Sequence, residues 1–133
     1  MSVGLLLITH VGVAKNLLDT ADRMLGSYTT KIKTIEVPLD AETESISNQA
    51  RQLLEELNQG HGILILTDLY GSTPSNIACN LITTPDIQLV AGINLPMLVR
   101  TLNYPDLTLD ELVNKAISGG KDGILQCTCK TTT

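Results

Sequence analysis

His10 and Asp68 can both take part in chemistry, and each follows a run of apolar residues. His10 comes directly after residues 3–9, and Asp68 directly after residues 62–67. A carboxylate that accepts a hydrogen bond from one imidazole nitrogen fixes the tautomer and leaves a lone pair on the other nitrogen. If the two runs are neighbouring strands, roughly 5 Å apart, the pair would make His10 a nucleophile.

The segment Gly71-Ser72-Thr73-Pro74 lies just beyond Asp68 and adds a third chemical feature. Pro74 suits the first position of a helix, with Thr73 as the N-cap. Glycine lets a backbone approach a ligand closely, and a helix N-terminus presents unpaired N–H groups with a partial positive charge. We expect Gly71, Ser72 and Thr73 to cradle an anionic phosphoryl group.

Each of these features also has a simpler interpretation. A histidine after a strand is more often an ordinary core or surface residue, and Asp68 could be a turn residue that hydrogen-bonds the backbone. The segment 71–74 could be only a helix start. The chemical interpretation is favoured because all three features fall at one predicted edge of the sheet.

The elements that would position these residues alternate between strands and helices. Apolar or β-branched runs predict strands at 3–9, 31–37, 62–67, 87–92 and about 123–128. Helical spacing of apolar residues predicts helices at 14–26, 46–57, from 74 through 81, shortly after 96, and from 108 to 119 or 120. Thr108 and Glu111 form a capping-box pattern at the start of the last helix.

This alternation predicts an α/β fold, a doubly wound, mostly parallel sheet of about five strands with helices on both faces. In a 2-1-3-4 order, the first and third strands are neighbours. Ligands of such sheets collect at the carboxyl ends of the strands, which is where His10 and Asp68 fall. Asn94, Pro96 and Met97 follow the fourth strand, so they could line the same crevice or merely start a helix with a buried methionine.

Composition narrows the class of protein. The 133 residues fit one domain, and 43% are apolar with no Phe or Trp, so Leu, Ile, Val and Ala must build the core. The net charge is −5 and the basic residues are scattered, which argues against nucleic acid as a partner. No apolar run is long enough to insert in a membrane. Three cysteines, an odd number, favour free thiols and a cytoplasmic location.

Three blocks of the sequence resemble those of one family. They are Leu7–His10, Leu66–Asn76 and Ala91–Leu98. Their order and spacing make nearly the whole chain similar to the enzyme IIA component of the mannose/fructose/sorbose class. That class belongs to the bacterial phosphoenolpyruvate-dependent sugar phosphotransferase system (PTS).

The resemblance implies that His10 accepts a phosphoryl group from phospho-HPr and passes it to a IIB protein, with Asp68 orienting the ring. Thr73 falls where the family usually has a serine that contacts the phosphoryl group, and Gly71 and Ser72 would add amides. The resemblance further implies a homodimer in which an antiparallel last strand, at about 123–128, is exchanged. No metal or organic cofactor is expected.

Several alternatives stay open at this point. We expect residues 1–133 to form a single IIA domain with no fused IIB domain, so that the IIB partner would be a separate protein. Without such a partner, the chain would be a regulatory phosphoacceptor. A dihydroxyacetone kinase phosphotransfer subunit is a related alternative. A nucleotide- or flavin-binding domain is disfavoured because no Gly-x-Gly-x-x-Gly or Walker pattern is present.

The remaining reactive residues carry weaker signals. His61, between two glycines, is interpreted as a turn residue at the opposite edge of the sheet. Cys79 is expected to pack as a small hydrophobe. Cys127 and Cys129 are too few ligands for a zinc site. Arg100 could meet a partner or lie on a solvated helix face.

Overall fold

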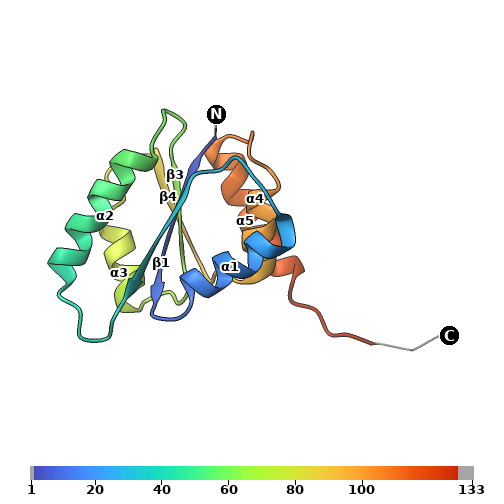
Figure 1. Ribbon diagram of the computed structural model, residues 1–133, viewed down its shortest axis with the longest axis horizontal. Helices are drawn as coiled ribbons and strands as arrows, with labels where there is room; N and C mark the ends of the chain where they lie inside the picture. The colour runs from blue at the N-terminus through green and yellow to red at the C-terminus, as the bar shows by residue number, and fades with distance from the viewer. Residues whose placement is uncertain (1, 129–133) are drawn as a thin grey trace.

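A parallel sheet covered by helices on both faces is the core of the computed structural model, which describes residues 2–128 (Figure 1). Its elements alternate along the chain. They are β1 (Gly4–His10), α1 (Ala14–Leu25), β2 (Ile32–Val37), α2 (Thr43–Leu57), β3 (Ile63–Thr67), α3 (Thr73–Asn80), β4 (Ile87–Ala91), α4 (Leu95–Leu102) and α5 (Leu109–Asp122).

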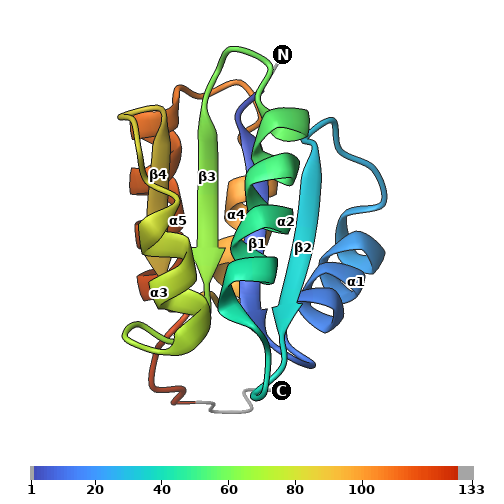
Figure 2. The ribbon, with the colours of Figure 1, turned by 90° about the vertical axis from the view of Figure 1, so that its left-hand side faces the viewer.

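The strand order is β2-β1-β3-β4, and every pair is parallel, which confirms the predicted 2-1-3-4 order. β1 therefore lies directly beside β3, with Ile8 opposite Thr67. The arrowheads of β1, β2 and β3 point to the same end of the molecule (Figure 2). The residues that follow these strands consequently meet at one edge.

The central strands are apolar along most of their length because both of their faces are buried, and their polar residues, Thr9, His10 and Thr67, lie at the carboxyl ends. In β1, Leu5 and Leu7 pack on one side of the sheet, and Leu6 and Ile8 on the other. This is the alternation expected of successive side chains in a strand. Helices α1, α4 and α5 cover the first face, and α2 and α3 cover the second (Figure 1).

The last helix is longer than predicted, because α5 continues through Gly119 and Gly120 to Asp122. These glycines serve packing rather than termination. A Cβ on Gly119 would lie 2.9 Å from the Cβ of Arg100, and a Cβ on Gly120 would lie 2.9 Å from the Cε of Met97. Glycine at these two positions therefore allows α5 to approach α4 closely.

The predicted fifth strand is not formed by the described residues. Residues 124–128 leave α5 and run outward from the sheet, pairing with none of the four strands (Figure 1). Ile124 is 77% exposed and Leu125 is 68% exposed. A strand needs a neighbour for its backbone hydrogen bonds, and this segment pairs with none of the described strands, although Ile124 borders a groove beside β4. Cys129 lies outside the described residues.

The capping box of Thr108 and Glu111 is confirmed at the start of α5. The N-cap of α3 is Ser72, one residue earlier than predicted, and Cys79 is exposed rather than packed.

Of the helices in residues 2–128, none combines the length and apolar character required to span a bilayer.

Candidate active site

The side chains of His10 and Asp68 are in direct contact at the carboxyl edge of the sheet. The Nδ1 of His10 lies 2.9 Å from the Oδ2 of Asp68, and the backbone N–H of His10 donates to the same oxygen at 3.1 Å. The Oδ1 of Asp68 accepts from the backbone N–H of Leu69 at 3.0 Å. The His10 side chain is 33% exposed, so the ring is held on one side and open to solvent on the other.

The strand register brings these two residues together. Ile8 is level with Thr67, the last residue of β3, so Asp68 directly follows the strand and lies one position short of His10. From there its carboxylate reaches both the ring and the backbone of the neighbouring strand. The pair thus depends on β1 and β3 being adjacent, which the fold provides.

The environment of Asp68 favours its ionised form. Burial, the largest single influence, works to raise the pKa of its carboxyl group. The hydrogen bonds from the His10 ring and backbone, together with the charge that the ring carries when it is protonated, outweigh burial and lower the pKa of Asp68. An ionised Asp68 accepts a hydrogen bond from Nδ1 when Nδ1 carries the proton. In this tautomer of the neutral ring, the lone pair of His10 is on Nε2.

Thr9 holds the turn that follows His10, a role that sequence reasoning missed. Its buried hydroxyl donates to the carbonyl of His10 at 2.8 Å and accepts from the backbone N–H of Ala14, the first residue of α1, at 3.0 Å. Gly12 has a φ of +91°, a conformation that favours glycine. The only signal in the sequence was a hydroxyl residue directly before the histidine.

The turn from Asp68 to Thr73 is closed by its own hydrogen bonds. Gly71, at a φ of +85°, donates its N–H to the Oγ of buried Ser75 at 3.2 Å. The N–H and the hydroxyl of Ser72 both donate to the carbonyl of Leu69, at 3.3 Å and 2.6 Å. The amides of Gly71 and Ser72 are therefore engaged within the turn. Thr73, the first residue of α3, is exposed.

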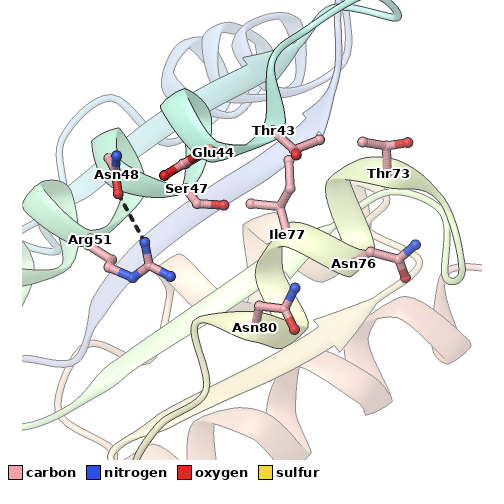
Figure 3. A pocket seen from close by; sticks show the side chains of 9 residues that line it. All are labelled: Thr43, Glu44, Ser47, Asn48, Arg51, Thr73, Asn76, Ile77 and Asn80. Carbon is pink, nitrogen blue, oxygen red and sulfur yellow. Dashed lines mark hydrogen bonds between the residues drawn. The ribbon is translucent and has the colours of Figure 1, made fainter.

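Thr73 also lies at the border of a polar cavity of about 450 Å³ between α2 and α3 (Figure 3). Glu44 and Arg51 contribute from α2, and Asn76 and Asn80 from α3. No side chain of the described residues caps the N-terminus of α3. Solvent and solutes can thus reach the first turn of α3.

Four large apolar side chains surround this edge and are largely exposed to solvent. They come from the loops that follow β1, β2 and β3: Val11, Leu39, Leu69 and Tyr70. A cluster of exposed apolar residues with a polar centre is typical of a protein interaction surface. We call these four residues the apolar rim.

The other predicted site residues lie further away. Asn94 caps α4 by accepting from the N–H of Met97 at 2.9 Å, and it donates to the carbonyl of Gly120 at 3.1 Å. Asn94 and Met97 line a groove between β4 and α5, and Pro96 borders a different cavity on α4. The proposed crevice-lining role of these three residues stays a prediction.

Arg100 and His61 are also placed. Arg100 forms an ion pair with Asp122 at 2.8 Å, which links α4 to the end of α5. His61 lies just before β3, at the edge opposite to His10. Within residues 2–128, no three His, Cys, Asp or Glu side chains are grouped so that they could hold a metal ion.

Comparisons with known proteins agree with this architecture. Residues 4–117 match the family model EIIA-man, described as the PTS system fructose IIA component. The chain is 31% identical, over 127 residues, to the PTS system mannose-specific EIIAB component of Escherichia coli (strain K12). That match covers 93% of this chain and 39% of the relative, so the chain spans about two fifths of that relative's length.

Two further proteins are similar. Over 79 residues the chain is 33% identical to the PTS system fructose-specific EIIA component of Bacillus subtilis (strain 168), covering 56% of this chain and 54% of that one. A solved structure, the mannose/sorbose specific IIA subunit of the phosphotransferase system from Enterococcus faecalis, matches with a TM-score of 0.86. It covers 100% of both chains at 24% identity, a likeness that establishes the fold.

Proposed function

Because the chain belongs to the EIIA-man family of PTS fructose IIA components, we propose that it is a phosphocarrier. It accepts a phosphoryl group from phospho-HPr on His10 and passes it to a IIB protein for sugar uptake. This exchange takes place in the cytoplasm, where the two thiols of the described residues, Cys79 and Cys127, would stay free.

The observation that carries the proposal is the 2.9 Å contact between Nδ1 of His10 and Oδ2 of Asp68. It leaves Nε2 as the nucleophilic nitrogen on the exposed side of the ring. Because the backbone of His10 is bound to the same carboxylate, the ring is positioned before a donor arrives. Positioning of this kind supplies a large part of the rate of a phosphoryl transfer.

The transfer is a displacement at phosphorus. The Nε2 lone pair of His10 forms the new N–P bond while the bond between phosphorus and the donor breaks, and the donor leaves with the bonding electrons. The imidazole gains positive charge as the bond forms, and ionised Asp68 offsets that charge. In onward transfer His10 is the leaving group, and the phosphorus passes to the IIB nucleophile.

Thr73 is the residue that we assign to the transferred phosphoryl group. Its position at the start of α3 combines a hydroxyl with the partial positive charge of a helix N-terminus. Gly71 and Ser72 contribute by shaping the turn, and their amides would bind phosphate only after exchanging their contacts with Ser75 and Leu69.

The apolar rim supports a protein, rather than a small molecule, as donor and acceptor. Its members lie on three separate loops around His10, and a partner that covers them would bury apolar surface while it brings its own phosphorylated residue to the ring. The absence of water from the covered site would also protect the phosphoryl group from hydrolysis.

We further propose that the protein is a homodimer in which residues from about 123 to 128 pair with β4 of the second subunit. β4 is the last strand of the sheet, and the groove beside it is lined by Val90, Met97, Ile117 and the same subunit's own Ile124. An antiparallel strand laid along this edge would cover that groove and bury Ile124 and Leu125, which are exposed in one subunit.

A reconstituted transfer assay tests the function. The protein is incubated with phosphoenolpyruvate, enzyme I and HPr, with and without a IIB protein, and the phosphoryl group is followed. We expect labelling on His10 and its disappearance when IIB is added. Stable retention in the presence of IIB would instead indicate a regulatory phosphoacceptor, and no labelling would overturn the proposal.

A further inference from the structure

Glu36 bridges the turn that directly follows His10. Its Oε1 accepts from the backbone N–H of Gly12 at 3.2 Å, and its Oε2 accepts from the backbone N–H of Lys15 at 3.0 Å. Glu36 belongs to β2 and is level with Thr9 of β1, one residue before His10. A side chain from a different strand thus holds the start of α1.

This bridge completes the hydrogen bonding of the turn. The N-cap residue of α1, Val13, has no side chain that could cap the helix. Each backbone N–H from residue 12 to residue 15 nevertheless has an acceptor. Gly12 and Lys15 donate to Glu36, Val13 donates to the carbonyl of His10, and Ala14 donates to the hydroxyl of Thr9.

The two helix N-termini next to the His10–Asp68 pair consequently differ. The N-terminus of α1 is occupied by a carboxylate, whose negative charge offsets the partial positive charge of the helix. The hydrogen bond from the N–H of Lys15 is the main cause of the lowered pKa of Glu36, with burial working against it, so the group is ionised at neutral pH. The N-terminus of α3 has no capping side chain among the described residues.

We propose that Glu36 is a positioning residue for phosphoryl transfer. It fixes the turn that directly follows His10 and closes the start of α1 to anions, so that the phosphoryl group is directed to Thr73 at the start of α3. This inference rests on the proposed function, and Glu36 itself touches neither the ring nor the phosphoryl group.

Glu36→Gln is the informative variant, because the two N–H groups are bound by two separate oxygens of Glu36 and an amide replaces one of these oxygens with an NH2 donor. At least one of Gly12 and Lys15 then loses its partner. We expect faster hydrogen exchange of these amides, and a rate of His10 phosphorylation at saturating phospho-HPr that falls on the order of tenfold. The KM for phospho-HPr should stay within about twofold, because the apolar rim is unchanged.

Glu111→Gln is the matched control. Glu111 also caps a helix by accepting from the N–H and hydroxyl of Thr108, and its pKa is also lowered, chiefly by the hydrogen bond from the Thr108 backbone. Glu111 lies at the start of α5. The N-cap residue Thr108 lines the same cavity as His61, at the edge of the sheet opposite to His10. Both variants should melt a few degrees lower, but only Glu36→Gln should slow phosphorylation.

A second measurement does not depend on phosphorylation. Inorganic phosphate is titrated into the unphosphorylated, ¹⁵N-labelled protein while the amide resonances are followed by NMR. In the wild type, we expect shifts around Thr73, and in Glu36→Gln additional shifts at Ala14 and Lys15. Equal amide exchange and equal phosphate shifts in the two proteins would overturn the role of Glu36. A wild type that phospho-HPr cannot label would overturn the proposed function instead.

Discussion

The Oδ2 atom of Asp68 is bound by two separate groups of His10, the ring Nδ1 at 2.9 Å and the backbone N–H at 3.1 Å. One oxygen therefore sets both the orientation of the imidazole and the position of the strand end that carries it. This double contact ties the chemistry of the ring to the packing of β1 against β3.

His10→Ala should abolish phosphorylation by phosphoenolpyruvate, enzyme I and HPr, because alanine has no imidazole nitrogen that could accept the phosphoryl group. His61→Ala is the control, since His61 lies at the opposite edge of the sheet, and it should be labelled at the wild-type rate. The measurement is incorporation of labelled phosphate. Label retained by His10→Ala would show that the acceptor has been assigned to the wrong residue.

Asp68→Asn should slow the phosphorylation of His10 by about 10- to 100-fold without unfolding the protein. Asparagine has nearly the same size, but it carries no charge to offset the developing imidazolium. Single-turnover labelling measures the rate, and circular dichroism checks the fold. A variant that transfers at the wild-type rate would mean that the carboxylate does not orient a reacting ring.

The lowered pKa of Asp68 predicts how stability depends on pH. A carboxyl group whose pKa is lower in the folded state stabilises that state above its ordinary pKa of 3.8, and the contribution is lost as the pH falls through the folded value. The free energy of unfolding of the wild type should therefore exceed that of Asp68→Asn at pH 7, and the difference should shrink below pH 3.8.

Asp40→Asn provides the control for this pH series. Asp40 is exposed on the loop between β2 and α2. The free energy of unfolding of Asp40→Asn should differ little from that of the wild type at every pH. Denaturant unfolding from pH 7 to pH 2.5 measures both variants. A gap between wild type and Asp68→Asn that widens on acidification would contradict the predicted sign.

Ile124→Asp should convert the proposed dimer to a monomer. Exchange of the last strand would bury Ile124 against the groove beside β4, and a carboxylate there would lose its hydration without a partner. Leu39→Asp should remain dimeric, because Leu39 lies on the exposed loop after β2, the outer strand furthest from β4. Analytical ultracentrifugation measures the mass in solution. A wild type that is monomeric at high concentration would refute strand exchange.

The sequence predicted most of the sheet and the pairing of His10 with Asp68. Runs such as 62–67 can be recognised in the sequence because a strand buried on both faces is nearly continuous in apolar residues. The capping box of Thr108 and Glu111 is readable because its partners are only three residues apart. Once the strands were ordered, the two site residues had to meet at one edge.

The features that were missed depend on contacts between distant parts of the chain. Glu36 of β2 binds the turn before α1, and it is 24 residues away in the sequence from Gly12, one of the two residues that it contacts. The continuation of α5 beyond Gly120 depends on how closely Met97 of α4 packs. Neither of these contacts has a local signature. The strand expected at 123–128 is, by contrast, a predicted element that is not formed, because this segment pairs with none of the described strands.

The residues of the His10–Asp68 pair are 58 positions apart in the chain. They come into contact only after the chain from β1 to β3 has folded. In an unfolded or partly synthesised chain, His10 therefore lacks its contact with the carboxylate of Asp68. If His10 accepts the phosphoryl group as proposed, we expect its labelling to rise when this half of the molecule folds. Enzymatic labelling during refolding would time the docking of β3 against β1, the long-range step that completes the site.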